Sequence, residues 1–214
     1  MDSLTGYEEK IKFWSIITIW FFQVVGVIGI SLGAEEWFIT KTPFNLLLGF
    51  FLMMVNFPIV SLRSIAVTNI CFLVGMTAEL IGVNQGLLFG SYEYGDNLGA
   101  KLGGVPFLIG VNWVTLVMTT AAISTRIFKP VVLRVLTGAL LMLGLDFLME
   151  GVAPGFDYWT FYGPPPASNY ITWFVIACGL HAIYQRSKTD GDFLFSINLF
   201  GSQVFFFAWF YFFS

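Results

Sequence analysis

Seven long apolar runs, separated by short polar segments, make up most of the chain. They lie at residues 13–32, 44–62, 64–88, 105–124, 131–149, 170–184 and 193–213. A helix needs about 20 consecutive apolar residues to cross the hydrocarbon core of a bilayer. The sixth run is shorter, but Tyr170 and Trp173 are side chains that anchor helices at a membrane interface. The pattern predicts an all-α bundle of seven transmembrane spans, forming a single integral membrane domain over residues 1–214.

The composition supports lipid as the solvent of this chain. Apolar residues make up 57% of the 214 positions and charged residues only 11%, whereas a soluble domain carries about 25% charged residues. We therefore expect a multi-pass protein of the cell inner (plasma) membrane. The ten Lys and Arg residues form no basic cluster, so we expect no binding of nucleic acid.

The placement of positive charge orients the predicted spans. If the connecting segments alternate between the two sides, eight of the ten Lys and Arg residues share the side of the N-terminus. Only Lys41 and Lys101 fall on the other side. Positively charged loops stay in the cytoplasm, so we expect a cytoplasmic N-terminus and an extracytoplasmic C-terminus. The first run lacks a small-residue cleavage site, and we expect it to be retained as a span.

Three acidic residues fall within or at the end of apolar runs: Glu79, Asp146 and Glu150. A charged side chain at the bilayer centre costs about 3 kcal/mol, and such residues usually face the bundle interior and have a role. Glu79 and Asp146 each lie about 22 Å from the cytoplasmic end of their run, and Asn112 falls in the same layer of the outer half. Asp146 and Glu150 are four residues apart and share a helix face. The alternative is that these groups only form hydrogen bonds between helices.

Two longer segments, residues 91–104 and 150–169, connect predicted spans on the outer side, and both are rich in aromatic residues. Their aromatic candidates are Tyr92, Tyr94, Tyr158 and Trp159. These side chains fit either an interfacial aromatic belt or contacts with a substrate. We expect Glu93 and Asp96 to be solvated loop charges.

Several kinds of chemistry lack the residues that they require. His181 is the only histidine, too few for a di-iron centre or a structural zinc site, and we expect it to be a satisfied helix residue. Cys71 and Cys178 lie inside apolar runs without a CxxC spacing, so we expect no disulfide. No lysine lies in a membrane core, which excludes a retinal Schiff base. We expect neither a metal nor a cofactor.

Two blocks of sequence carry a resemblance to a known family. The first is residues 79–113, with Glu79, the Phe89-Gly90-x-Tyr92-x-Tyr94 loop, the Gly104-Val105-Pro106 turn and Asn112-Trp113. The second runs from Asp146 to Glu150 and continues through Tyr158-Trp159, Pro166, Asn169-Tyr170 and Trp173-Phe174. Over residues 75–185 the chain resembles the membrane-integral carotenoid biosynthesis family, which includes carotenoid 1,2-hydratases and bisanhydrobacterioruberin hydratases. It differs at Gly151, where the family pattern has a proline.

The resemblance implies an enzyme, a hydro-lyase that adds water to the terminal double bond of an acyclic carotenoid end group. The substrate would be a lycopene-like or monocyclic polyene, and other enzymes of carotenoid biosynthesis would be possible partners. The implied catalytic residues are Glu79, Asp146 and Glu150. The implied substrate-binding residues are Asn112, Trp113, Tyr92, Tyr94, Tyr158, Trp159 and Asn169. Protonating an alkene and capturing the cation with water needs a carboxylic acid and an ordered water, with either Asp146 or Glu79 as the donor.

Two other functions fit the same residues. A membrane lycopene cyclase would share the protonation step but would trap the cation with an internal double bond. A non-catalytic carotenoid- or lipid-binding membrane protein would retain the pigment and leave its mass unchanged.

Overall fold

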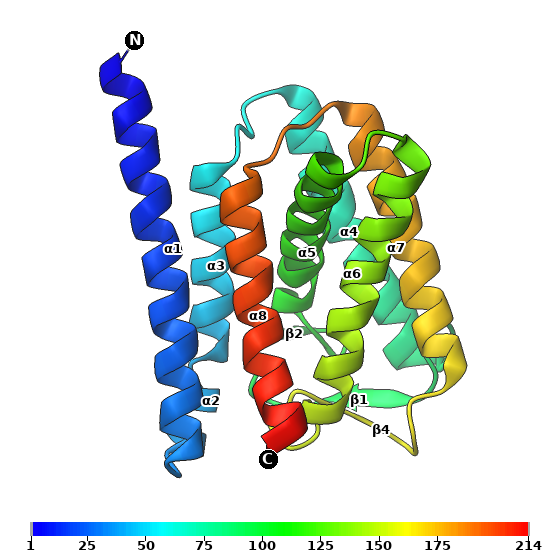
Figure 1. Cartoon of the computed structure of the whole chain (residues 1–214). Helices are drawn as coiled ribbons and strands as arrows, with labels where there is room; N and C mark the ends of the chain where they lie inside the picture. The colour runs from blue at the N-terminus through cyan, green and yellow to red at the C-terminus, as the bar shows by residue number, and fades with distance from the viewer. Residues whose placement is uncertain (1, 214) are drawn as a thin grey trace.

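A computed structural model describes residues 2–213 as an all-α bundle with a small β-structured cap at one end (Figure 1). Its helices are α1 (Asp2–Ser31), α2 (Glu35–Ile39), α3 (Thr42–Asn56), α4 (Leu62–Gln85), α5 (Phe107–Ile127), α6 (Val131–Val152), α7 (Ala167–Ser187) and α8 (Phe193–Phe213). Its strands are β1 (Tyr92–Tyr94), β2 (Lys101–Leu102), β3 (Val105–Pro106) and β4 (Trp159–Phe161). The expectation of an all-α bundle is confirmed.

Each of the seven predicted runs overlaps one helix of the bundle, namely α1, α3, α4, α5, α6, α7 or α8. Five of these helices (α1, α4, α5, α6 and α8) are long and apolar enough to cross a membrane by length and composition. Helix α3 has only 15 residues, and α7 combines 21 residues with several polar side chains. The chain is therefore a multi-pass membrane protein, while seven spans and their orientation stay predictions.

The second predicted run, residues 44–62, is wrong at its carboxyl end. Helix α3 stops at Asn56, and Phe57 is extended with φ −113° and ψ 139°. The cause is Pro58, because a proline ring disfavours helical backbone in the residue before it. Helix α4 then starts at Leu62, where Ser61 and Ser64 form a reciprocal capping box.

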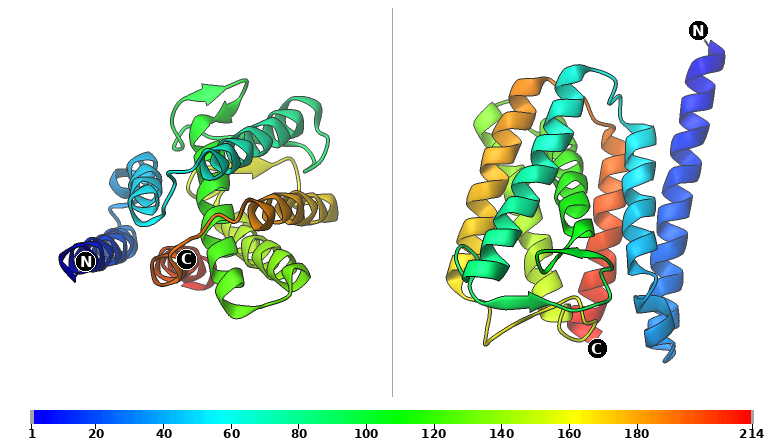
Figure 2. Two further views of the ribbon diagram at one scale, coloured as in Figure 1. Left: turned by 90° about the horizontal axis from the view of Figure 1, so that it is seen from above. Right: turned by 180° about the vertical axis from the view of Figure 1, so that it is seen from behind.

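Helix α5 occupies the centre of the bundle and packs against α3, α4, α6, α7 and α8 (Figure 2). A helix that is apolar all round is stable only when it is surrounded, and 89% of the apolar window of α5 is buried. Its hydroxyl side chains return hydrogen bonds to their own helix, as Thr115 does to the Val111 carbonyl at 3.0 Å. This central helix carries Asn112 and Trp113.

His181 of α7 packs against α5 as a satisfied core residue, as expected. It is fully buried, and its Nε2 lies 2.9 Å from the Thr120 hydroxyl. Its Nδ1 lies 2.7 Å from the Ala177 carbonyl oxygen. Cys71 and Cys178 are both free thiols.

The strands gather at the end of the bundle opposite to the start of α1 (Figures 1 and 2). Strands β1 and β4 pair antiparallel, with Tyr92 opposite Phe161 and Tyr94 opposite Trp159. Strands β2 and β3 form a second short antiparallel pair. The two long loops of the sequence are thereby joined into one cap over α4, α5, α6 and α7. This pairing was not predicted, because strands of two or three residues are too short for an alternating pattern to be recognised.

The predicted orientation can be tested by labelling introduced cysteines in a background that carries Cys71→Ala and Cys178→Ala. We expect a membrane-impermeant maleimide to label Ala100→Cys, on the capped end, in intact cells. We expect Lys129→Cys, in the turn between α5 and α6, to react only after permeabilisation. Both positions are exposed, so the reverse labelling pattern would show that the bundle is inserted the other way round.

Candidate functional site

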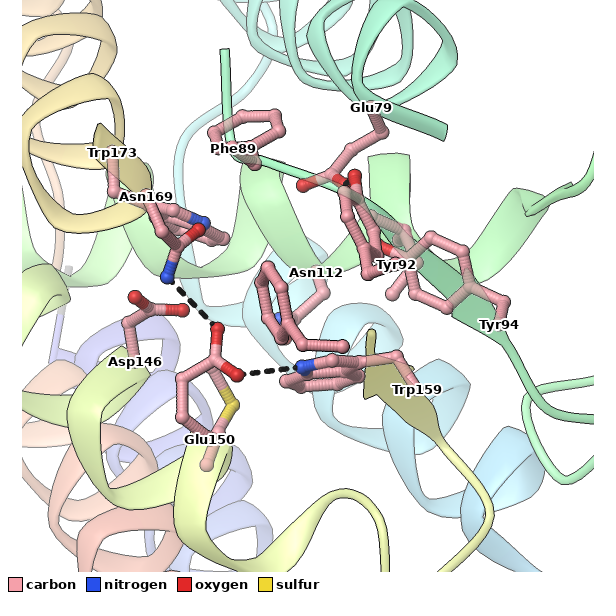
Figure 3. A pocket seen from close by; sticks show the side chains of 13 residues that line it. Glu79, Phe89, Tyr92, Tyr94, Asn112, Asp146, Glu150, Trp159, Asn169 and Trp173 are labelled. Atoms are coloured by element: carbon pink, nitrogen blue, oxygen red, sulfur yellow. Dashed lines mark hydrogen bonds between the residues drawn. The ribbon is translucent and has the colours of Figure 1, made fainter. Parts of the chain in front are cut away.

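A polar cavity of about 30 Å³ lies beneath the cap, between α4, α5, α6 and α7 (Figure 3). It is lined by Glu79, Phe89, Tyr92, Tyr94, Ile109, Asn112, Asp146, Met149, Glu150, Trp159, Phe161, Asn169 and Trp173. A cavity needs about 10–15 Å³ to hold one water molecule. The space is therefore large enough for about two waters, and its walls combine three carboxyl groups with six aromatic rings.

Glu79 is held by three hydrogen-bond donors. Its Oε2 accepts from the Tyr92 hydroxyl at 2.5 Å and from the Tyr94 hydroxyl at 2.8 Å. Its Oε1 accepts from the Trp113 indole N–H at 3.2 Å. The side chain is only 3% exposed, and a buried carboxyl needs such partners because water cannot solvate it. Hydrogen bonds therefore tie α4 to β1 and to α5 at this carboxyl.

The two tyrosines remain protonated donors to Glu79. Burial, followed by the neighbouring Glu79 carboxyl, raises the pKa of Tyr92. The same causes raise the pKa of Tyr94 well above its ordinary value. Both hydroxyls therefore stay neutral near pH 7 and stabilise a negative charge on Glu79 without supplying one of their own.

Alternation along β1 explains why the two tyrosines point the same way. Side chains at i and i+2 of a strand lie on one face, so Tyr92 and Tyr94 are buried while Glu93 is exposed. On the paired strand, Trp159 and Phe161 line the same cavity. The Tyr-x-Tyr and Trp-x-Phe spacings thus place four rings on the inner face of the cap.

Two glycines of α4 make room for the groups that bind Glu79. A Cβ atom at Gly82 would lie 2.7 Å from the Tyr92 hydroxyl oxygen, closer than real Cβ contacts allow. A Cβ atom at Gly75 would overlap the ring of Trp113. Glycine at these positions lets a tyrosine and a tryptophan approach the helix on either side of its carboxyl.

The indole of Trp113 is fixed by a second ring from α7. Trp113 and Trp173 are stacked, with ring centroids 4.0 Å apart and an angle of 13° between their planes. An aromatic pair of this kind contributes about 0.5–1.5 kcal/mol beyond its buried area. The stack holds the Trp113 N–H towards Glu79 and connects α5 with α7.

Asp146 and Glu150 face the cavity from α6, on the opposite side from Glu79 (Figure 3). Glu150 accepts from the Trp159 indole N–H at 3.0 Å and from the Asn169 side-chain amide at 3.0 Å. Asp146 is 1% exposed, and its buried Oδ2 has no hydrogen-bond partner among residues 2–213. The two neighbouring acids therefore differ: Glu150 accepts two hydrogen bonds, whereas the buried Oδ2 of Asp146 accepts none from the described residues.

Eight of the ten residues predicted for the site line the cavity: Glu79, Asp146, Glu150, Asn112, Tyr92, Tyr94, Trp159 and Asn169. Trp113 does not line the cavity, but its indole N–H donates a hydrogen bond to Glu79, which does. Tyr158 is placed elsewhere: it is buried against α3, with its hydroxyl 2.7 Å from the Thr42 hydroxyl. Tyr158 lies in the bend directly before β4, outside the strand whose residues Trp159 and Phe161 face the cavity.

Sequence reasoning missed five apolar residues that line the cavity: Phe89, Ile109, Met149, Phe161 and Trp173. In a chain with 25 phenylalanines, an apolar side chain carries no signal of its own. Phe161 could have been found from its i+2 spacing to Trp159, had the short strand been recognised. Glu93 and Asp96 are exposed, as predicted, and Lys101 lowers the pKa of Asp96 through a hydrogen bond and through its charge.

A larger cavity of about 300 Å³ lies beside α1, between α1, α2 and α3. Its lining is mainly aromatic and aliphatic, with Lys41, Thr42 and Asn45 as its polar members. It contains no carboxyl group, so it offers no acid for chemistry. Within the described residues, no three His, Cys, Asp or Glu side chains come together as metal ligands.

Fold and site together define a class, namely a multi-pass helical membrane protein with buried carboxyl groups in an aromatic pocket beneath one end of its bundle. The sequence profile described as "Carotenoid biosynthesis protein" matches residues 41–211. The chain belongs to this carotenoid biosynthesis family, as the resemblance of the two sequence blocks implied. The match covers the acid pocket and begins after α1 and α2. Comparison with curated proteins and with solved structures gave no match.

The donors to Glu79 can be tested by Tyr94→Phe. The substitution removes one hydrogen bond to a buried carboxyl, and bonds of this kind contribute about 1.5–3 kcal/mol. We expect a loss of that size in the free energy of unfolding in detergent micelles. The control is Tyr162→Phe, which removes a hydroxyl that donates to Glu93 at 2.8 Å on the exposed surface, and we expect it to change stability little. Equal effects of the two substitutions would contradict the assignment.

Proposed function

We propose that the protein is a carotenoid 1,2-hydratase. It adds one water across the terminal double bond of an acyclic carotenoid end group and leaves a tertiary hydroxyl group. The observation that carries this proposal is the bare carboxyl group of Asp146, buried in a pocket of aromatic rings. Membership of the carotenoid biosynthesis family supports a polyene as the substrate.

In this mechanism Asp146 donates the proton. No protein group among residues 2–213 donates to or accepts from its Oδ2, so a proton held there is available to a substrate. A buried carboxyl without donors is poorly suited to carry a charge, and a neutral carboxylic acid is the form that can protonate an alkene. The proton goes to the less substituted carbon of the terminal double bond, and the positive charge forms on the tertiary carbon.

Glu79 and Glu150 act as the carboxylates that stabilise the cation and accept the proton of the attacking water. Both accept hydrogen bonds from neutral donors, three for Glu79 and two for Glu150. Such donors stabilise the carboxylate form. A carboxylate stabilises a nearby cation and takes the proton of the attacking water. The Asn112 side chain lies on the same cavity wall and can orient that water.

Ring faces supply the remaining stabilisation of the cation. The negative face of an aromatic ring attracts a positive charge, by about 2 kcal/mol or more when the pair is desolvated. The cavity is bounded by rings from the cap and from α7, among them Tyr92, Trp159 and Trp173. These rings also exclude bulk water, so only an ordered water molecule reaches the tertiary carbon.

The pocket must widen to admit the end of a polyene. A cavity of about 30 Å³ is far below the roughly 300–1,000 Å³ of ordinary ligand pockets. Strand β4 is the part of the cap that can move, because it has three residues and pairs only with β1, whereas β1 is held by Glu79. A shift of β4 away from β1 would carry Trp159 and Phe161 away from the acids while Tyr92 and Tyr94 keep their bonds to Glu79.

The activity can be tested by expressing the chain in a bacterium that accumulates lycopene. We expect carotenoids that are heavier by the mass of one or two waters and that carry tertiary hydroxyl groups. A ring-containing product of unchanged mass would instead identify a lycopene cyclase. Pigment that is bound by the purified protein but not altered would identify a carotenoid-binding protein.

The acid can be tested by Asp146→Asn in the same host. We expect the hydroxylated product to fall at least 100-fold, because an amide cannot supply the proton, while the free energy of unfolding is unchanged or increased. The control is Glu36→Gln, which alters an exposed acid at the same end of the bundle and should leave the yield unchanged. Full hydration by Asp146→Asn would exclude this residue as the donor, and Glu79→Gln would then be the next variant to examine.

A further inference from the structure

A second polar cavity, also of about 30 Å³, lies deeper in the bundle between α1, α3, α5 and α8. Four amide side chains line it, one from each of these helices: Gln23, Asn45, Asn112 and Gln203. Such a gathering is unusual inside a membrane, where polar side chains are costly and are kept for hydrogen bonds or for a function. The remaining lining is aliphatic apart from Thr115, whose hydroxyl donates to its own helix.

The amides do not satisfy one another. The Oε1 atom of Gln203 is buried without a hydrogen-bond partner, and the residue is only 8% exposed. Within residues 2–213, no side-chain hydrogen bond joins any two of the four amides. A buried acceptor without a partner costs about 1–3 kcal/mol. The size and polarity of the cavity fit about two water molecules, each of which needs two to four polar partners.

Asn112 connects this cavity with the acid pocket. It is the one residue that lines both of them within the described chain. It stands on α5, and its side chain borders both the amide-lined cavity and the acid pocket. A water held in the amide-lined cavity would therefore be separated from the acid pocket by the Asn112 side chain.

We propose that the amide-lined cavity stores the water that the enzyme adds, and that Asn112 passes it to the acid pocket. This inference rests on the proposed hydratase function and adds the site that determines the outcome of the reaction. The Asp146 proton forms a C–H bond and leaves a tertiary cation. The stored water then forms the C–O bond, and its surplus proton goes to a carboxylate of the pocket. Overall the substrate gains one water, and no electron donor or acceptor is needed.

If the amide-lined cavity holds no water, the substrate is still protonated, but the product of the reaction changes. A cation that meets no water loses a proton from a neighbouring carbon to the carboxylate and becomes an alkene of the original mass. The amides of α1, α3 and α8 are therefore specificity-determining groups that do not touch the substrate. Loss of these amides should lower hydration and leave proton exchange intact.

The experiment compares the wild-type protein with the variant that combines Gln203→Met and Asn45→Leu. Both substitutions keep the side-chain size and remove the amide. Membranes containing each protein are incubated with lycopene in heavy water, and both the hydroxylated product and the deuterium in recovered carotenoid are measured by mass spectrometry. We expect the double variant to lose at least tenfold in hydroxylated product while deuterium in the recovered carotenoid stays equal or rises.

The matched control is Asn198→Leu. It removes an amide from the same helix, and that amide accepts from Trp20 at 2.9 Å outside the cavity. We expect the control to keep the wild-type ratio of hydroxylated product to deuterated alkene. A double variant that lost product and deuterium uptake together would indicate general damage to the site and would overturn the inference.

Failure of the two proposals gives different results. If the wild-type protein forms no product heavier by one water, the proposed function is wrong. If the wild-type protein hydrates lycopene and the double variant does so at the same rate and ratio, the function stands and the water store is refuted.

Discussion

The hydrogen bonds to Glu79 are the interaction on which the rest of the site depends. One carboxyl on α4 collects donors from β1 and from α5, so it fixes the cap and the central helix at the same point. The position of β1 determines the position of β4, because the two strands are paired. The Trp113 indole likewise determines the position of the Trp173 ring, because the two rings are stacked. The walls of the pocket are therefore arranged around a group that is costly to bury and that is fully supported.

The three carboxyls of the pocket differ in what surrounds them rather than in kind. Glu79 has three donors and Glu150 has two, whereas the buried Oδ2 of Asp146 has none among the described residues. Environments that separate acids in this way assign them different parts in proton transfer. Asp146 is the carboxyl that costs the fold most, because it is buried without a donor, and this favours a part in the proposed reaction over a part in stability.

The sequence was sufficient to predict the bundle and the layer of the acids. Long apolar runs and a fixed rise per residue placed Glu79 and Asp146 at similar depths, and the structure brings both to one cavity. The cap could not be predicted, because β1 and β4 are short strands separated by more than sixty residues. That pairing decides which aromatic residues of β1 and β4 face inward, so Trp159 lines the cavity, whereas Tyr158, which precedes β4, does not. Gln23, Asn45 and Gln203 were also missed, since an amide in an apolar run shows no partner until the helices are packed.

The order of residues along the chain has a consequence for how the site is assembled during synthesis. Domains and segments that are made first fold first, and Glu79, Tyr92, Tyr94 and Trp113 all precede Asp146. The donors of Glu79 are thus made before Asp146 and Glu150 enter the membrane. Trp159 and Asn169, which donate to Glu150, follow both acids in the chain, so the Glu79 half of the pocket is complete in sequence before the Glu150 half begins.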